Sequence, residues 1–288
     1  MQHVSGICTV YPSKVNNPSD LKEKGVPCLR IAMVVLGLAI APSLAVAADV
    51  IKVNPRPGVV LRILADVPAD AKVLVLLFPG GAGKVRITDD GTIRGTKGNF
   101  LTRSRRLFVA GGIATALIDA PSDHMDKAGL TFPYRMTAEH AGDIAQVIAR
   151  LRTDYPGRAI WLVGTSRGST SAANAAANLT TGGPNGLVLT STVGVSSRHG
   201  GNVLDFKLEN ITVPILVVHH VDDGCGITPI SGARNIKARL GGATVSELME
   251  IKGGSGGSGK TCGAKSHHGF LGIEQRVVDA ISAWIKSH

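Results

Sequence analysis

Residues 159–179 constrain the fold of this chain more than any other stretch, because three kinds of structure follow one another there without a linker. Residues 159–163 form a continuous apolar run, which predicts a strand covered on both faces. Residues 164–168 read Gly-Thr-Ser-Arg-Gly, and the Ala-rich residues 169–179 favour a helix. A serine in a tight strand-to-helix turn needs glycines beside it, since a Cβ there would obstruct the turn. Ser166 is therefore the leading candidate for a nucleophile.

The rest of the chain repeats the same alternation of strand and helix. Two short strands are predicted first, and from residue 72 onward apolar runs alternate with amphipathic segments, which predicts a mostly parallel sheet with helices on both faces. The predicted strands are residues 50–53, 59–64, 72–78, 113–119, 186–191, 213–220 and 245–251. The predicted helices are residues 101–109, 228–240 and 272–286, with a further helix that begins at Thr137 and runs to Leu151.

The N-terminal segment has the pattern of a secretory signal. Residues 31–48 are apolar, follow several basic residues and end in small residues, which predicts cleavage after Ala47 or Ala48. A membrane anchor is the alternative, but Pro42 and the lack of a basic flank after the run disfavour it. We therefore expect a leader at 1–48, one globular domain at 49–288, and a secreted or periplasmic location.

Cysteine usage and charge add two expectations. Two of the four cysteines, Cys8 and Cys28, lie in the leader, so Cys225 and Cys262 remain in the exported chain. Export favours one disulfide between them over two unpaired thiols. The formal net charge is +10, but the basic residues form no block and no aromatic-plus-basic patch. A solvated basic surface is therefore expected rather than a nucleic-acid partner.

Four segments, in chain order, resemble the α/β-hydrolase superfamily, and the resemblance covers residues 59–288. Residues 78–81 look like its oxyanion loop, 164–168 like its nucleophile elbow, 219–223 like its acid turn and 268–270 like its histidine loop. The resemblance implies an α/β-hydrolase fold, with a mostly parallel central sheet covered by helices on both faces. Only about twenty residues separate the strands that end near 191 and begin at 213, so no large lid domain is expected there.

The resemblance also implies a catalytic triad. Ser166 needs a base to take its proton, and the two candidates are His267 and His268. His268 is preferred because it directly precedes the Gly-Phe pair and the closing helix, where hydrolases of this kind hold their base. The orienting acid is expected to be Asp223, with Asp222 as the alternative.

The oxyanion donors and the disulfide belong to the same set of loops. The donors would be the backbone N–H of Arg167 and that of Gly80 or Gly81. Cys225 follows Asp223 closely and Cys262 precedes His268, so their bond would tie the acid loop to the histidine loop.

Two other motifs suggest different chemistry. His219 and His220 invite a metal interpretation, but adjacent strand residues point to opposite faces and no spaced Cys/His set completes a site, so no metal is predicted. Residues 254–261 match the G-x-x-x-x-G-K-[ST] phosphate-binding pattern. The helix that should begin at the Lys-Thr pair is missing, so we expect a flexible loop that carries the disulfide.

These expectations converge on an exported serine hydrolase that cleaves a carboxylic ester, or a related acyl bond, through an acyl-enzyme on Ser166. A small, open pocket, a small-molecule substrate and no cofactor are expected, with no nucleic-acid partner and no membrane partner after signal removal. Arg167 is compatible with an anionic substrate, although a solvent-facing Arg is commoner there. A peptidase or amidase with the same triad, and a non-catalytic binding protein on the same scaffold, are the alternatives.

Overall fold

The computed structural model describes residues 48–198, 200–257 and 259–288, which belong to one compact unit, Ala45–His288. The predicted signal peptide lies outside the described residues and stays a prediction. None of the described helices is both long enough and apolar enough to cross a membrane.

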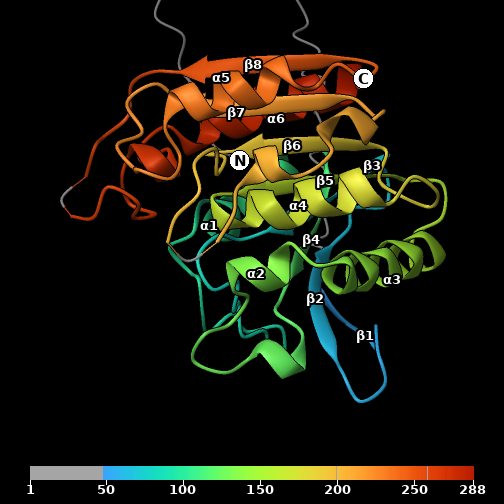
Figure 1. The fold of residues 1–288 in the computed structure, drawn as a ribbon. Coiled ribbons are helices and arrows are strands. Elements are labelled where there is room, and N and C mark those ends of the chain that lie inside the picture. The colour runs from blue at the N-terminus through green and yellow to red at the C-terminus, as the bar shows by residue number, and fades with distance from the viewer. Residues whose placement is uncertain (1–47, 199, 258) are drawn as a thin grey trace, which may run out of the picture. The chain divides into compact units, whose positions relative to one another are not determined.

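An eight-stranded sheet forms the centre of this unit (Figure 1). Its strands lie in the order β1-β2-β4-β3-β5-β6-β7-β8. The β1–β2 and β2–β4 pairs are antiparallel and all other pairs are parallel, so the prediction of a mostly parallel sheet is confirmed. The strands are β1 Asp49–Val53, β2 Leu61–Asp66, β3 Val73–Phe78, β4 Ala114–Ile118, β5 Ala159–Thr165, β6 Gly186–Thr190, β7 Ile215–His220 and β8 Ser246–Ile251.

Helices lie in most of the connections between the parallel strands, and one more helix follows the last strand. They are α1 Phe100–Ala110, α2 Phe132–Arg135, α3 Ala138–Asp154, α4 Arg167–Asn178, α5 Ile230–Ala238 and α6 Glu274–Ser287. Short 3-10 turns lie at η1 Ser122–His124, η2 Val203–Asp205, η3 Leu208–Asn210 and η4 His267–Gly269. Only η2 and η3 interrupt the connection from β6 to β7 within its described residues, so no lid domain is inserted there.

The structure shortens one predicted helix and contains one that was not predicted. The helix expected at residues 228–240 spans only Ile230–Ala238. Pro229 is its N-cap, and the Thr228 hydroxyl donates a hydrogen bond to the Asp223 carboxylate. The four-residue helix α2 was not predicted. It begins where the Thr131 side chain accepts a hydrogen bond from the Tyr134 amide, with Pro in its first turn.

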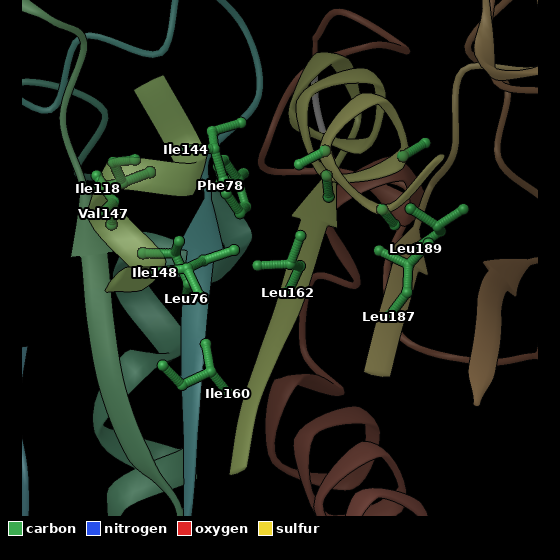
Figure 2. Packing of buried hydrophobic residues seen from close by; sticks show 14 of the residues in the cluster. Leu76, Phe78, Ile118, Ile144, Val147, Ile148, Ile160, Leu162, Leu187 and Leu189 are labelled. Carbon is green, nitrogen blue, oxygen red and sulfur yellow. The ribbon is translucent and has the colours of Figure 1, made fainter. Parts of the chain in front are cut away.

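Strand β3 shows why apolar and polar residues do not alternate in the sequences of the central strands. Leu74, Leu76 and Phe78 face a core cluster that includes residues of α3 and α4, whereas Val75 and Leu77 face a second cluster that includes residues of α1 and α6. Figure 2 shows the first cluster, in which Leu76 and Phe78 lie beside residues of α3. Both faces of the strand are therefore buried, as the unbroken apolar runs predict.

Helix α3 follows its predicted pattern closely. The Thr137 side chain accepts a hydrogen bond from the His140 amide, which caps the helix as expected. Its apolar positions at helical spacing are all buried, and Figure 2 shows three of them, Ile144, Val147 and Ile148, packed toward the sheet. Burial of this stripe holds α3 against the strands and fixes the loop that precedes it.

The carboxyl ends of the parallel strands bring the candidate residues to one edge of the sheet. Gly80 follows β3, Ser166 follows β5 and Asp223 follows β7. Parallel strands place these ends together, which is where ligands bind in open α/β sheets.

Candidate active site

Ser166 occupies the turn between β5 and α4 with a backbone that few non-glycine residues adopt, at φ 52° and ψ −128°. A Cβ on Gly164 would lie 2.5 Å from the carbonyl oxygen of Gly168, and a Cβ on Gly168 would lie 1.9 Å from that of Phe78. Both glycines are thus required by the close approach of the backbones, which confirms the steric interpretation of the motif.

His268 lies at the end of the histidine loop and contacts the predicted acid. Its Nδ1 is 2.9 Å from Oδ2 of Asp223, and both side chains are buried. Two further donors hold the carboxylate: the Cys225 amide, 3.0 Å from Oδ1, and the Thr228 hydroxyl, 2.9 Å from Oδ2. A carboxylate with this many donors is fixed in orientation and can orient an imidazole.

The alternative residues lie elsewhere. Asp222 is exposed, and its amide donates to Nδ1 of His220 at 3.0 Å. The His267 ring stacks on that of His220, with ring centroids 4.3 Å apart. The structure therefore brings Asp223 and His268 together, and leaves Asp222 and His267 outside this pair.

The candidate nucleophile and the histidine line the same cavity, which has a volume of about 460 Å³. Its lining residues include Ser166, His268, Gly80 and Gly81. Gly80 packs directly on the nucleophile, because a Cβ there would lie 2.8 Å from the Cβ of Ser166. Arg167 contributes the first amide of α4, and such an N-terminal amide has no acceptor within its own helix. The Arg167 amide is therefore available to a ligand atom at Ser166.

The fit of Gly80 against Ser166 gives a first prediction. Gly80→Val is expected to lower kcat for ester hydrolysis by about 10²-fold or more, because the added side chain displaces the loop that would hold the oxyanion. Gly142→Ala is the control, since a Cβ at that helical position meets nothing within 4 Å. Equal kcat values for Gly80→Val and Gly142→Ala, with both proteins folded, would contradict the role of this loop.

The predicted disulfide is present between Cys225 and Cys262. Cys225 is buried beside Asp223, to which its amide donates, and Cys262 lines the cavity that contains Ser166 and His268. The bond therefore ties the loop of the acid to the loop of the histidine, as expected from the sequence.

Sequence reasoning missed a buried arginine that contacts the loop expected to hold the oxyanion. The Arg135 side chain is 1% exposed, with hydrogen bonds to the Gly81 carbonyl at 3.3 Å and to the Ser171 hydroxyl at 2.5 Å. Burial, together with the charge of Arg167, lowers the pKa of Arg135. No sequence signal marked this residue, because α2 was not predicted and an arginine is normally solvated.

His140 completes this network and is expected to make stability depend on pH. Its Nε2 lies 2.8 Å from the Ser171 hydroxyl. Burial, and next the charge of Arg135, lowers the pKa of His140 from 6.5 to about 3. The folded protein therefore keeps His140 neutral, whereas the unfolded chain protonates it below pH 6.5. The contribution of His140 to the free energy of unfolding is therefore present above pH 6.5 and is lost as the pH falls from 6.5 toward 3.

This linkage is measurable by urea unfolding at pH 7.5 and pH 5. His140→Gln is expected to make the drop in unfolding free energy between these pH values smaller by about 2 kcal/mol. His288→Gln removes an exposed histidine and should leave the drop as in the wild type. An unchanged drop in His140→Gln would show that His140 titrates alike in both states.

The histidine pair on β7 contacts two different sets of partners, as strand alternation predicts. His219 Nε2 lies 2.8 Å from the Thr228 carbonyl oxygen, and burial lowers its pKa. His220, Asp222 and His267 could together offer ligand atoms to a metal ion, within 4.8 Å of one another. Both ring nitrogens of His220 already have partners, the Asp222 amide and the Gly253 carbonyl. A metal would have to displace one of these bonds.

The phosphate-binding pattern at residues 254–261 does not have the structure that its chemistry requires. Lys260 and Thr261 lie in a turn, in which the Gly263 amide donates to the Lys260 carbonyl, and no helix begins among the described residues of this segment. The amides of a helix N-terminus, which cradle phosphate in such motifs, are therefore missing there. The prediction of a loop at this position is confirmed.

Comparison with known proteins identifies the fold. No protein-family model and no curated relative matches the sequence. An esterase from Pyrococcus furiosus superposes with a TM-score of 0.59 and 12% identity, covering 83% of this chain and 92% of its own. A dienelactone hydrolase from Anabaena variabilis superposes with a TM-score of 0.56 and 15% identity, covering 84% of this chain and 97% of its own. An α/β serine hydrolase without a lid, from Xanthomonas campestris, superposes with a TM-score of 0.54 and 18% identity, covering 84% of this chain and 98% of its own. The described chain therefore has the α/β-hydrolase fold.

Proposed function

We propose that this protein is a serine hydrolase that cleaves a carboxylic ester through an acyl-enzyme on Ser166. One observation carries the proposal: Ser166, in its strained turn, lines the same cavity as His268, whose ring is 2.9 Å from the Asp223 carboxylate. Nucleophile, base and orienting acid come from three loops at one edge of the sheet. This arrangement suits acyl transfer.

The reaction runs in two halves. His268 takes the proton of the Ser166 hydroxyl as its oxygen attacks the ester carbonyl, and Asp223 stabilises the imidazolium that forms. The Arg167 amide and an amide of the Gly80–Gly81 segment stabilise the negative oxygen of the tetrahedral intermediate. His268 then protonates the departing alcohol, which leaves an acyl-enzyme. Water, activated by the same histidine, releases the acid and restores Ser166.

The shape of the chain at this site supports small, water-soluble substrates. The cavity that Ser166 shares with His268 is about 460 Å³, and no lid domain interrupts the described β6–β7 connection. Because no lid is inserted there to cover an extended acyl chain, esters of short acids should be better substrates than esters of long-chain acids. The Cys225–Cys262 bond also supports export, because disulfides persist in oxidising compartments.

A fluorophosphonate probe tests the proposal directly. Such a probe reacts covalently with a serine activated by a neighbouring base, so one equivalent is expected on the peptide that contains Ser166. Ser166→Ala should remain unlabelled, whereas Ser287→Ala, a change of the same kind near the C-terminus, should label like the wild type. Absence of labelling in folded wild-type protein would favour a binding protein on this scaffold instead.

A further inference from the structure

Two cavities, not one, meet at Ser166. The first, of about 460 Å³, is lined by His268 and Asn99, and the second, of about 630 Å³, by Arg167 and Arg198. Gly81, Ser166 and Cys262 line both, so the nucleophile lies on the boundary between them. An ester bound at Ser166 therefore has one cavity available for its alcohol part and another for its acyl part.

The position of His268 decides which part enters which cavity. Under the proposed mechanism, His268 must donate a proton to the departing alcohol oxygen, so that oxygen lies beside the imidazole. His268 lines the first cavity and is not among the described residues that line the second. The alcohol part therefore occupies the first cavity, and the acyl chain extends into the second.

Two arginines, Arg167 and Arg198, line the second cavity, and no Asp or Glu is among its described lining residues. The Arg167 guanidinium lies 4.7 Å from the centroid of the Phe132 ring, a contact that holds this half-buried cation in place without neutralising it. Arg135, which is buried, donates a hydrogen bond to the carbonyl of Gly81, a residue that lines both cavities.

We propose that the acyl part of the substrate carries a second carboxylate, so that the enzyme cleaves monoesters of dicarboxylic acids. The free carboxylate would lie in the second cavity, where Arg167 and Arg198 donate charge-assisted hydrogen bonds to it. The planar, two-pronged geometry of guanidinium suits carboxylate recognition. This inference rests on the proposed ester hydrolysis and assigns its substrate class.

The test compares kcat/KM for three chromogenic esters of phenols. 4-Nitrophenyl hemiglutarate carries the anion on the acyl part, 4-nitrophenyl valerate is a neutral ester of similar length, and the valerate ester of a sulfonated nitrophenol carries the anion on the leaving group. The wild type is expected to prefer the hemiglutarate to neutral valerate by roughly tenfold or more at low salt, and the preference should shrink as ionic strength rises.

Variants separate the site from the general charge of the protein. Arg198→Gln is expected to lower the hemiglutarate-to-valerate ratio by roughly tenfold, and Arg198→Lys should retain part of it. Arg106→Gln removes the same charge from an exposed position on α1 that lines neither cavity, and should keep the wild-type ratio. Circular dichroism and thermal unfolding establish that each variant is folded.

Two results would overturn the inference. Equal kcat/KM for hemiglutarate and neutral valerate would show that the second cavity does not select an anion. A preference confined to the sulfonated leaving group would place the anion on the alcohol side. In either case, turnover of the neutral ester would leave the proposed function intact. Loss of all ester turnover, together with no probe labelling at Ser166, would instead overturn the proposed function itself.

Discussion

His268→Ala is expected to lower kcat for ester hydrolysis by about 10⁴- to 10⁶-fold, because under the proposed mechanism Ser166 then loses the base that takes its proton. The structure gives a matched control in the adjacent residue. His267 stacks on His220, and its Nδ1 lies 3.3 Å from the Asp222 carbonyl oxygen, outside the contact between His268 and Asp223. His267→Ala should therefore change kcat by less than about tenfold.

The two variants are best compared by steady-state kinetics on a short-chain ester, with thermal unfolding as the measure of folding. His268→Ala removes a side chain whose ring is bonded to Asp223 and 3.1 Å from the Thr228 hydroxyl, so a small loss of stability is expected as well. Comparable losses of kcat in the two variants, or a larger loss in His267→Ala, would refute the assignment of His268 as the base.

Asp223→Asn is expected to lower kcat by about 10⁴-fold while the protein remains folded. The amide has nearly the shape of the carboxylate but cannot stabilise an imidazolium, and it favours the wrong tautomer of the His268 ring. Asp222→Asn makes the same chemical change one residue earlier, where the side chain is exposed, and should have little effect on kcat.

The comparison of Asp222→Asn with Asp223→Asn also distinguishes a general effect of negative charge in this turn from an effect of direct contact with the His268 imidazole. Both substitutions remove one negative charge from the same turn, so a general electrostatic effect would lower kcat in both variants alike. Only direct contact with His268, as the 2.9 Å distance of Asp223 provides, predicts a large loss in one variant alone. A loss of kcat in Asp222→Asn as large as in Asp223→Asn would contradict this geometry.

Much of the fold follows from the sequence because the central strands are buried on both faces. Alternate residues of β3 contact different core clusters, so every position is apolar and the strand stands out in the sequence. The turn at Ser166 stands out for a related reason, since the backbones beside Gly164 and Gly168 leave no room for a Cβ. Local steric demands of this kind leave a readable pattern.

The parts that were missed depend on contacts between distant segments. Thr228 was expected to begin a helix, but its hydroxyl donates to Asp223 instead, and the helix begins only at Ile230. Arg135 is buried through bonds to carbonyls of a loop more than fifty positions earlier, which no local pattern encodes. Polar residues recruited by tertiary contacts look like ordinary loop residues in a single sequence.

The central claim, an acyl-enzyme on Ser166, is tested most directly by rapid-quench mass spectrometry. Protein mixed with excess 4-nitrophenyl acetate and quenched in acid within the first turnover should carry one acetyl group on the peptide that contains Ser166, matched by a burst of nitrophenol of equal amount. Ser166→Ala should show neither. Hydrolysis of the ester by Ser166→Ala at the wild-type rate would contradict the account. An acetyl group on another residue would contradict it outright.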